Sequence, residues 1–195
     1  MLEDLTASGV IRKLYAWETA LLKAHFLRLD ADARHGRFAA GVSDATVSAY
    51  ADKALGPDAI VHGFFVDGVL RGAAELRLMP AHTGEVAVSV EEDWRLTGVG
   101  SALFGRLLLT ARNRGLTDLV MTCLPSNRAM QRLAARFEGR ITYASGDSHA
   151  RVAARPATPL SLWRELWRDS AAAAETVVER QIGLIRRAPG WSGAR

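Results

Sequence analysis

The sequence predicts an α/β fold, in which helices pack on a mixed (α+β) sheet, with one additional helix at the C-terminal end. Valine recurs at every second position in residues 85–90, as in a half-buried strand, and apolar residues after Gly98 recur at helical spacing. The dipeptide Asp67-Gly68 separates two apolar runs, which is a strong hairpin signal. With 195 residues, 49% of them hydrophobic, the chain can bury one sizeable core.

The N-terminal part is predicted to contain a short strand near residues 10–13 and two helices. The first helix lies within residues 11–29, and its apolar face is formed by Trp17, Leu21, Leu22 and Phe26. A polar stretch over residues 30–41 ends this helix. A second helix is expected over residues 43–54, beginning at Ser43.

The remainder is predicted to alternate between strands and helices. The expected strands are 60–66, 69–79, 85–90, 116–124, 140–143 and 150–154. A helix follows the loop at Gly98, and another follows Ser126, which is a good N-cap. The predicted order is therefore strand, two helices, three strands, helix, strand, helix and two strands.

The turn after the strand at 85–90 has the composition of a phosphate-binding loop. A helix N-terminus presents unpaired N–H groups and the positive end of the helix dipole. Gly98 and Gly100 would let a diphosphate approach this backbone closely, and Arg95 adds positive charge. A dinucleotide fingerprint would need glycine where Leu103 stands, and a Walker A loop would need Lys followed by Ser or Thr after the second glycine. The sequence thus indicates an anionic cofactor of another kind.

Residues 95–100, Arg-Leu-Thr-Gly-Val-Gly, resemble the Arg/Gln-x-x-Gly-x-Gly/Ala loop of the GNAT superfamily of acyl-CoA N-acyltransferases. A second match follows downstream, at Asn127, Met130, Leu133 and Phe137. The resemblance covers roughly residues 9–155 and is sharpest over 85–137. It implies a GNAT acetyltransferase domain over residues 1–155, followed by a C-terminal amphipathic helical extension over residues 156–195.

The resemblance also implies a reaction and a set of binding residues. Acetyl-CoA would be the acyl donor, and the acetyl group would pass to a primary amine, of a small molecule or a protein lysine, by direct attack through a tetrahedral intermediate. No metal is expected. The cofactor-binding residues implied are Val88, Ser89, Val90, Arg95, Leu96, Thr97, Gly98, Val99, Gly100, Ser101 and Asn127.

Three residues are candidates for proton transfer. Glu85 lies near the position where many members of the family carry a catalytic glutamate, and a base is useful because an alkyl ammonium is protonated at neutral pH. The alternative for Glu85 is a solvent-facing carboxylate at a strand end. The tyrosine that often protonates the thiolate in this family falls at Ala134, so Tyr143, or water, would take that role. Glu75 is a second candidate base, or else a cross-strand surface partner.

Other site classes find little support in the sequence. The five histidines show no metal-ligand spacing and are expected mostly on the surface or in loops. The single cysteine, Cys123, is expected to be a buried, inert thiol. The formal charge of +4 comes from basic residues interleaved with carboxylates, so no nucleic-acid partner is expected.

Two segments outside the cofactor motif suggest what the protein interacts with: residues 26–38 and the segment after Pro159. Residues 26–38, ending in Arg37-Phe38, resemble a stretch between the first two helices of some bacterial GNAT enzymes; alternatively Phe38 anchors the core and Arg37 is solvated. After Pro159, apolar residues including Trp163 and Trp167 recur at helical spacing. This helix would pack on the domain or on a second subunit, which makes a homodimer plausible.

The sequence also predicts a cytoplasmic protein that does not interact with membranes. No segment approaches the roughly 18 apolar residues of a membrane span, and the N-terminus lacks the features of a signal peptide. The main alternative to an enzyme is a non-catalytic acyl-CoA-binding regulatory module of the same fold.

Overall fold

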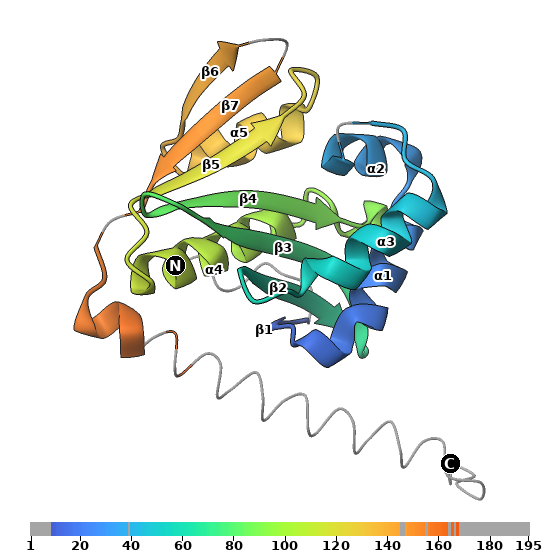
Figure 1. The fold of residues 1–195 in the computed structure, drawn as a ribbon, viewed down its shortest axis with the longest axis horizontal. Helices are drawn as coiled ribbons and strands as arrows, with labels where there is room; N and C mark the ends of the chain where they lie inside the picture. The colour runs from blue at the N-terminus through green and yellow to red at the C-terminus, as the bar shows by residue number, and fades with distance from the viewer. Residues whose placement is uncertain are drawn as a thin grey trace, which may run out of the picture.

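A mixed sheet runs through the molecule and carries helices on both faces (Figure 1). The computed structural model describes residues 9–167 except 39, 145, 146, 155, 164 and 166. Within them, seven strands lie in the order β1-β2-β3-β4-β5-β7-β6. The strands are β1 (Val10–Lys13), β2 (Ala59–Val66), β3 (Val69–Met79), β4 (Thr83–Val90), β5 (Asp118–Cys123), β6 (Arg140–Ala144) and β7 (Asp147–Ala153). The helices are α1 (Thr19–Arg28), α2 (Ala31–Phe38), α3 (Asp44–Ala54), α4 (Val99–Asn113) and α5 (Arg128–Arg136), with 3-10 turns η1 (Ala16–Glu18) and η2 (Glu92–Trp94).

Strands β1 to β4 form the antiparallel meander that the sequence predicts. Asp67 and Gly68 connect β2 to β3 with φ angles of 50° and 74°, which is the left-handed geometry that a tight hairpin requires. The expected strand at 10–13 is confirmed as β1, at one edge of the sheet.

Strand β4 changes partners along its length. It pairs with β3 from Thr83 to Val90, but it pairs with β5, in parallel, only from Thr83 to Glu85. Beyond Glu85 the two strands diverge, and β5 pairs over its full length with β7 (Figure 1). Residues 86–90 of β4 therefore have no strand partner on the β5 side.

Two hydrophobic cores lie on opposite faces of the sheet. The first lies between the sheet and helices α4 and α5; its largest fully buried side chains include Phe64, Phe104, Leu107, Leu119 and Met121. The second lies under α1, α2 and α3, and includes Leu22, Phe26, Val47 and Ala51. Helices α1 to α3 cover only the meander, so in the described chain the α1 side of β5, β7 and β6 carries no helix (Figure 1).

The segment over residues 30–41 departs from prediction, because most of it is helix α2 rather than an irregular break. Asp30 supplies the start signal: its carboxylate accepts a hydrogen bond from the N–H of Ala33 at 2.9 Å, as an N-cap does. There are thus three helices before β2, not two. Helix α1 also differs from expectation, since Trp17 lies before it, 77% exposed, while Leu22, His25 and Phe26 form its buried side.

Three of the five histidines, His35, His82 and His149, are exposed or partly exposed, as expected for most of them, but the other two are buried. His25 and His62 are 0% and 1% exposed. Each ring makes hydrogen bonds inside the protein: His25 contacts Glu91 and Ser89, and His62 contacts the Thr110 hydroxyl at 3.0 Å. The expectation for Cys123 is confirmed, since it is buried, with its sulfur 3.1 Å from the Ser148 hydroxyl.

The beginning of the C-terminal extension is held against α4. Residues 159–163 are helical. The Glu165 carboxylate accepts hydrogen bonds from Thr110 at 2.9 Å and Asn113 at 2.6 Å. The Trp163 and Trp167 rings stack with centroids 5.5 Å apart and remain exposed. The rest of the predicted extension, from residue 168, lies outside the described residues, and in the described part no helix is long and apolar enough to cross a membrane.

The buried His62 gives the fold a predictable dependence on pH. Burial, reinforced by the charge of Arg106, lowers the pKa of His62 to about 3. The unfolded chain therefore binds a proton near pH 6.5 that the folded chain does not bind. We expect the free energy of unfolding to fall by ~1.4 kcal/mol per pH unit from this residue as the pH drops from 6.5 toward 3.

This contribution is measured by urea unfolding at pH 7, 6 and 5. His62→Gln, which keeps an N–H donor for Thr110, should reduce the pH slope, although His25 still contributes in the same direction. His35→Gln is the control, because His35 is exposed. Equal slopes for the wild type and His62→Gln would contradict the assignment.

Candidate functional site

The loop between β4 and α4 leaves a helix N-terminus open. Gly98 adopts a φ of 94° just before α4, and no side chain caps the helix. A Cβ on Gly100 would contact only the Val90 side chain, at 3.8 Å, so packing within the protein does not require glycine there. The backbone of the first turn is thus accessible, and its N–H groups suit an anionic group such as a diphosphate. We call residues 95–101 the cradle loop, because the sequence predicts a diphosphate-binding site there.

The side chains of the predicted loop residues point in different directions. Leu96 is 96% exposed with a φ of 62°, whereas Val99 is fully buried in the α4-side core. The Thr97 hydroxyl donates a hydrogen bond to the carbonyl of Trp94 at 2.7 Å. Leu96, Thr97 and Val99 could therefore contact a cofactor mainly through their backbone, as could Ser101, which lies in the first turn of α4.

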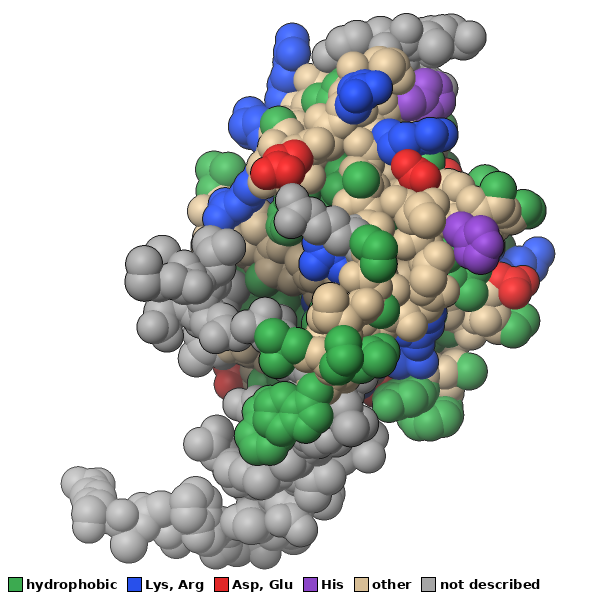
Figure 2. Space-filling view, turned by 90° about the vertical axis from the view of Figure 1, so that its left-hand side faces the viewer, with side chains coloured by type: hydrophobic (Ala, Val, Ile, Leu, Met, Phe, Trp, Pro, Cys, Tyr) green, Lys and Arg blue, Asp and Glu red, His purple; other side chains and the backbone are tan. Residues whose placement is uncertain are grey.

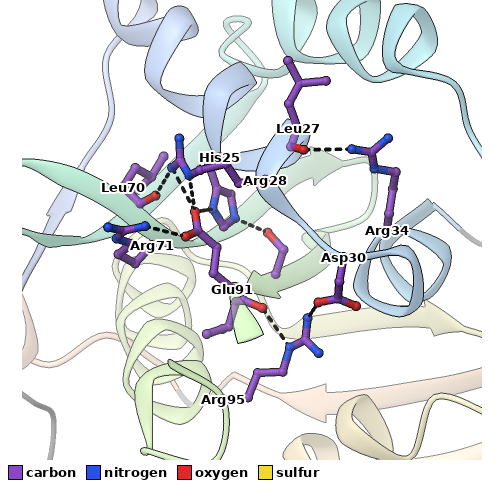
Figure 3. A network of polar contacts seen from close by, with 11 residues as sticks. His25, Leu27, Arg28, Asp30, Arg34, Leu70, Arg71, Glu91 and Arg95 are labelled. Atoms are coloured by element: carbon purple, nitrogen blue, oxygen red, sulfur yellow. Dashed lines mark hydrogen bonds and ion pairs between the residues drawn. The ribbon is translucent and has the colours of Figure 1, made fainter. Parts of the chain in front are cut away.

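Arg95 points back across the end of β4 (Figure 3). Its Nε donates to the carbonyl of Val90 at 3.1 Å, and its guanidinium forms an ion pair with Asp30. Asp30 is the N-cap of α2. Burial favours a higher pKa for the Asp30 carboxyl, but hydrogen bonds from the Ala33 N–H and from Arg95 outweigh it and lower this pKa. Arg95 stays about one-third exposed. It therefore lies beside the cradle while being bound to the start of α2.

The predicted β4 residues Val88, Ser89 and Val90 all lie beyond the last pair with β5. Val88 and Val90 pack toward α4, and Ser89 faces the other side, where it is buried. Backbone groups on the open edge of this segment have no strand partner, so an extended ligand could supply one.

A buried carboxylate anchors the end of β4, at a position that sequence reasoning missed. Glu91 accepts hydrogen bonds from His25 at 3.1 Å, Arg28 at 2.9 Å and Arg71 at 2.9 Å (Figure 3). These three donors outweigh the effect of burial and lower the pKa of Glu91 to about 2. Arg28 also donates to the carbonyl of Leu70 at 2.6 Å. Helix α1 is thereby fixed to β3 and to the start of the cradle loop.

His25 connects this network to β4 itself. Burial lowers the pKa of His25, so the ring is neutral, and this assigns Nδ1–H as the donor to Glu91 and Nε2 as the acceptor for the Ser89 hydroxyl, at 2.9 Å. A histidine at the centre of the apolar side of α1 was the one local signal for this network. Its partners lie more than 60 residues away in the chain, at separations of 66 and 64.

Asn127 is the N-cap of α5, where the sequence suggested Ser126. Its side-chain oxygen accepts from the N–H of Met130 at 3.1 Å, and its Nδ2 donates to the carbonyl of Gly36 at 3.3 Å. Gly36 is in α2. The two predicted cofactor residues that act through long polar side chains, Arg95 and Asn127, thus both donate to the α2 segment, one at each end.

Glu85 is exposed and forms the last β4–β5 pair, with Val120. It faces the same side of the sheet as Ser89, away from α4, at the point where the strands begin to diverge. Within the described residues its carboxylate makes no hydrogen bond or ion pair. Its position agrees with either sequence interpretation, a base beside the divergence or a solvated strand residue.

Glu75, the other candidate base, is buried and occupied. It forms an ion pair with Arg37 and accepts from the Tyr50 hydroxyl at 2.7 Å. The alternative in which Arg37 is solvated is therefore wrong, since its side chain is 9% exposed. Glu75, Arg37 and Tyr50 hold α2 and α3 on the sheet. Both carboxylate oxygens of Glu75 are thus already engaged by side chains of the protein.

Tyr143 has its backbone in β6, opposite Ser148. Its side chain lies outside the described residues, so its role as a proton donor stays a prediction. In the described chain no group of three His, Cys, Asp or Glu residues could hold a metal ion.

Comparison with solved structures finds the same fold in several acetyltransferases. The GNAT domain of S. lividans PAT is 19% identical, with a TM-score of 0.63 over 73% of this chain and 89% of that chain. The PaiA N-acetyltransferase from Thermoplasma acidophilum, in complex with coenzyme A, is 15% identical, with a TM-score of 0.60 over 75% and 99%. The ribosomal-protein-S18-alanine N-acetyltransferase from Escherichia coli is 15% identical, with a TM-score of 0.60 over 77% and 97%. At these identities the likeness shows the fold alone.

A search of curated proteins found no match. The model of the acetyltransferase (GNAT) family, however, matches residues 14–139. This range contains strands β2 to β4, the cradle loop with α4, and the Asn127 cap of α5. With more than half of its length matched, the chain belongs to the acetyltransferase (GNAT) family.

Proposed function

We propose that this protein transfers an acetyl group from acetyl-CoA to a primary amine, of a small molecule or a protein lysine. The observation that carries the proposal is the uncapped N-terminus of α4, which follows β4 after the short turn η2, together with the part of β4 that has no partner on the β5 side. A diphosphate bound at this helix end would lie beside an open strand edge along which a pantetheine arm could extend. Relatives of the same fold include an N-acetyltransferase in complex with coenzyme A.

Acetyl-CoA supplies the activated thioester, and the residues of this chain bind, orient and move protons. The N–H groups from Val99 to Ser101, with Arg95, hold the diphosphate. Open backbone groups of residues 88–90 orient the pantetheine arm and the thioester oxygen. Asn127 contacts the arm from the α5 side.

Glu85 removes the proton that an alkyl ammonium carries at neutral pH, directly or through water. Its location at the divergence of β4 and β5, exposed on the face opposite α4, supports this role, because an amine can approach from that face. The departing thiolate takes its proton from Tyr143 or from water.

A non-catalytic acyl-CoA-binding module remains the second candidate. One observation favours it: Ala134, at the position of the tyrosine often found in the family, is fully buried and brings no proton donor. The two candidates share the cofactor site and differ in turnover.

The cofactor site is tested by replacing Gly100. Gly100→Glu would fill the space over the helix N-terminus and place a negative charge there, so acetyl-CoA binding should be lost in isothermal titration calorimetry. Gly41→Glu is the control, because a Cβ at Gly41 meets no atom within 4 Å and Gly41 lies between α2 and α3, away from the cradle loop. Unchanged affinity in Gly100→Glu would refute the site.

The catalytic role is tested by Glu85→Gln. An exposed residue should tolerate this change, so the melting temperature and the acetyl-CoA affinity should stay at the wild-type level. We expect kcat, followed by thiol release with an amine acceptor, to fall by a factor of about 10² to 10⁴, with partial recovery at higher pH where more of the amine is neutral. Turnover equal to wild type would sink the assignment. Absence of turnover in the wild type with a broad amine panel would favour the binding module.

The ion pair between Arg95 and Asp30 gives a third test. Asp30→Asn removes the charge but keeps a side-chain oxygen that can cap α2. The Arg95 guanidinium would then be freer to meet a diphosphate, so the Kd for acetyl-CoA should fall by a factor of about 1.5 to 5, the range for solvent-accessible ion pairs. Asp44→Asn is the matched control, since Asp44 pairs with Arg34 away from the loop. A weaker affinity in Asp30→Asn would show that Asp30 helps to position Arg95 for binding.

A further inference from the structure

One row of side chains crosses the open face of the sheet, starting from Glu85. Glu85 pairs with Val120 of β5, Val120 pairs with Arg151 of β7, and Arg151 pairs with Arg140 of β6. Directly opposed residues in neighbouring strands point to the same face. The row therefore runs from a carboxylate at the β4–β5 divergence to two guanidinium groups at the sheet edge.

The next row extends the same surface. Thr122 of β5 pairs with His149 of β7, and His149 pairs with Thr142 of β6. A surface hollow of about 390 Å³ lies over these strands, lined by Val120, Arg140, Thr142, His149, Ala150 and Arg151. Its polar side chains are donors, and its formal charge comes from arginine. We call it the arginine hollow.

The surroundings of the arginine hollow leave it accessible. Helices α4 and α5 cover the other face of β5, and helices α1 to α3 cover only the meander (Figure 1). Arg140, Thr142 and Arg151 are exposed. Figure 2 shows Lys and Arg side chains and a His side chain at the top of the molecule, the end that β6 and β7 form in Figure 1.

The arginines of the hollow are only weakly neutralised within the described chain. Arg151 approaches Asp118 at 3.9 Å, and its side chain is 67% exposed. Arg140 makes no ion pair with a described residue. Two cations on one face therefore have most of their hydrogen-bonding capacity free for an external anion.

We propose that the arginine hollow binds an anionic group of the acceptor, a carboxylate or a phosphate, while the acceptor amine lies at Glu85. The inference rests on the proposed function. Neighbouring strands are ~4.8 Å apart, so the backbone at Glu85 is about 10 Å from that at Arg151 and about 14 Å from that at Arg140. Glu85 would bind the ammonium of the acceptor, and Arg151 and Arg140 would bind its anion. The acceptor therefore carries an amine and an anionic group separated by a distance of this order. A polyamine, which has no anion, is disfavoured.

The test uses three blocked peptides that share one lysine and differ only at the second residue after it, which is Glu, Gln or Arg. Binding of each peptide is measured by calorimetry in the presence of CoA at low and high salt, and acetylation is measured separately by thiol release. The variant is the double substitution Arg140→Gln with Arg151→Gln. Arg132→Gln is the control, because Arg132 is exposed on α5, on the opposite face.

We expect the Glu peptide to bind wild type at least fivefold more tightly than the Gln peptide and the Arg peptide to bind most weakly, with smaller differences at high salt. The double variant should lose this preference and Arg132→Gln should keep it. Equal binding of the three peptides, or tighter binding of the Arg peptide, would overturn the inference. Binding with the expected preference but without acetylation would leave the arginine hollow supported and would favour the non-catalytic acyl-CoA-binding module.

Discussion

The rest of the structure depends on the change of partner along β4. A strand in the middle of a sheet normally has its backbone groups paired on both sides, and β4 does so for three residues only. From residue 86 the side of β4 that faces β5 is unpaired, so this half of β4 is an edge strand although it lies in the middle of the sheet. Such an edge either remains solvated or pairs with something from outside the chain. The cradle loop begins where this edge ends, so the open edge and the helix N-terminus are continuous, as the proposed cofactor path requires.

A buried charge network keeps that path in place. Glu91 sits between the end of β4 and the loop, and its carboxylate has three donors from α1 and β3. Two of these donors, Arg28 and Arg71, are cations, and removal of either would leave the buried carboxylate less well compensated. Arg95 and Asn127 are held differently, because each donates to the α2 segment, Arg95 to Asp30 and Asn127 to the Gly36 carbonyl. Helix α2 thus contacts residues on both sides of the proposed cofactor path. Cofactor binding at Arg95 or Asn127 would therefore compete with their hydrogen bonds to α2.

Much of the fold could be predicted from local patterns. The hairpin at Asp67-Gly68, the helix at Ser43 and the loop at Gly98 each have signals within a few residues, and each element formed as expected. Helix α2 was missed because its sequence is polar. Its start and its attachment to the sheet are fixed by an N-cap and by ion pairs with residues far along the chain. The candidate site likewise depends on contacts between residues that are far apart in the sequence.

The motif formed by Arg95, Gly98 and Gly100 could be recognised in the sequence, but the contacts that orient the cradle loop could not be predicted from it. The burial of His25 depends on Ser89 and Glu91, and the burial of Glu75 depends on Arg37 and Tyr50. A pattern of single residues gives no information on such pairings unless the fold is known. The register that aligns Glu85 with Arg151 and Arg140 is also a property of three strand pairings, one of them parallel and distant in sequence.

The position of Trp94 gives the protein a built-in optical reporter. Its ring packs edge-on against Phe64 at a centroid distance of 5.6 Å, and its backbone precedes Arg95 directly. The other described tryptophans, Trp17, Trp163 and Trp167, are 77%, 60% and 63% exposed. Their emission should resemble that of indole in water, while Trp94 emits from a partly apolar environment. Quenchers dissolved in the buffer should therefore suppress the exposed rings first, and the remaining blue-shifted light should follow the state of the cradle loop.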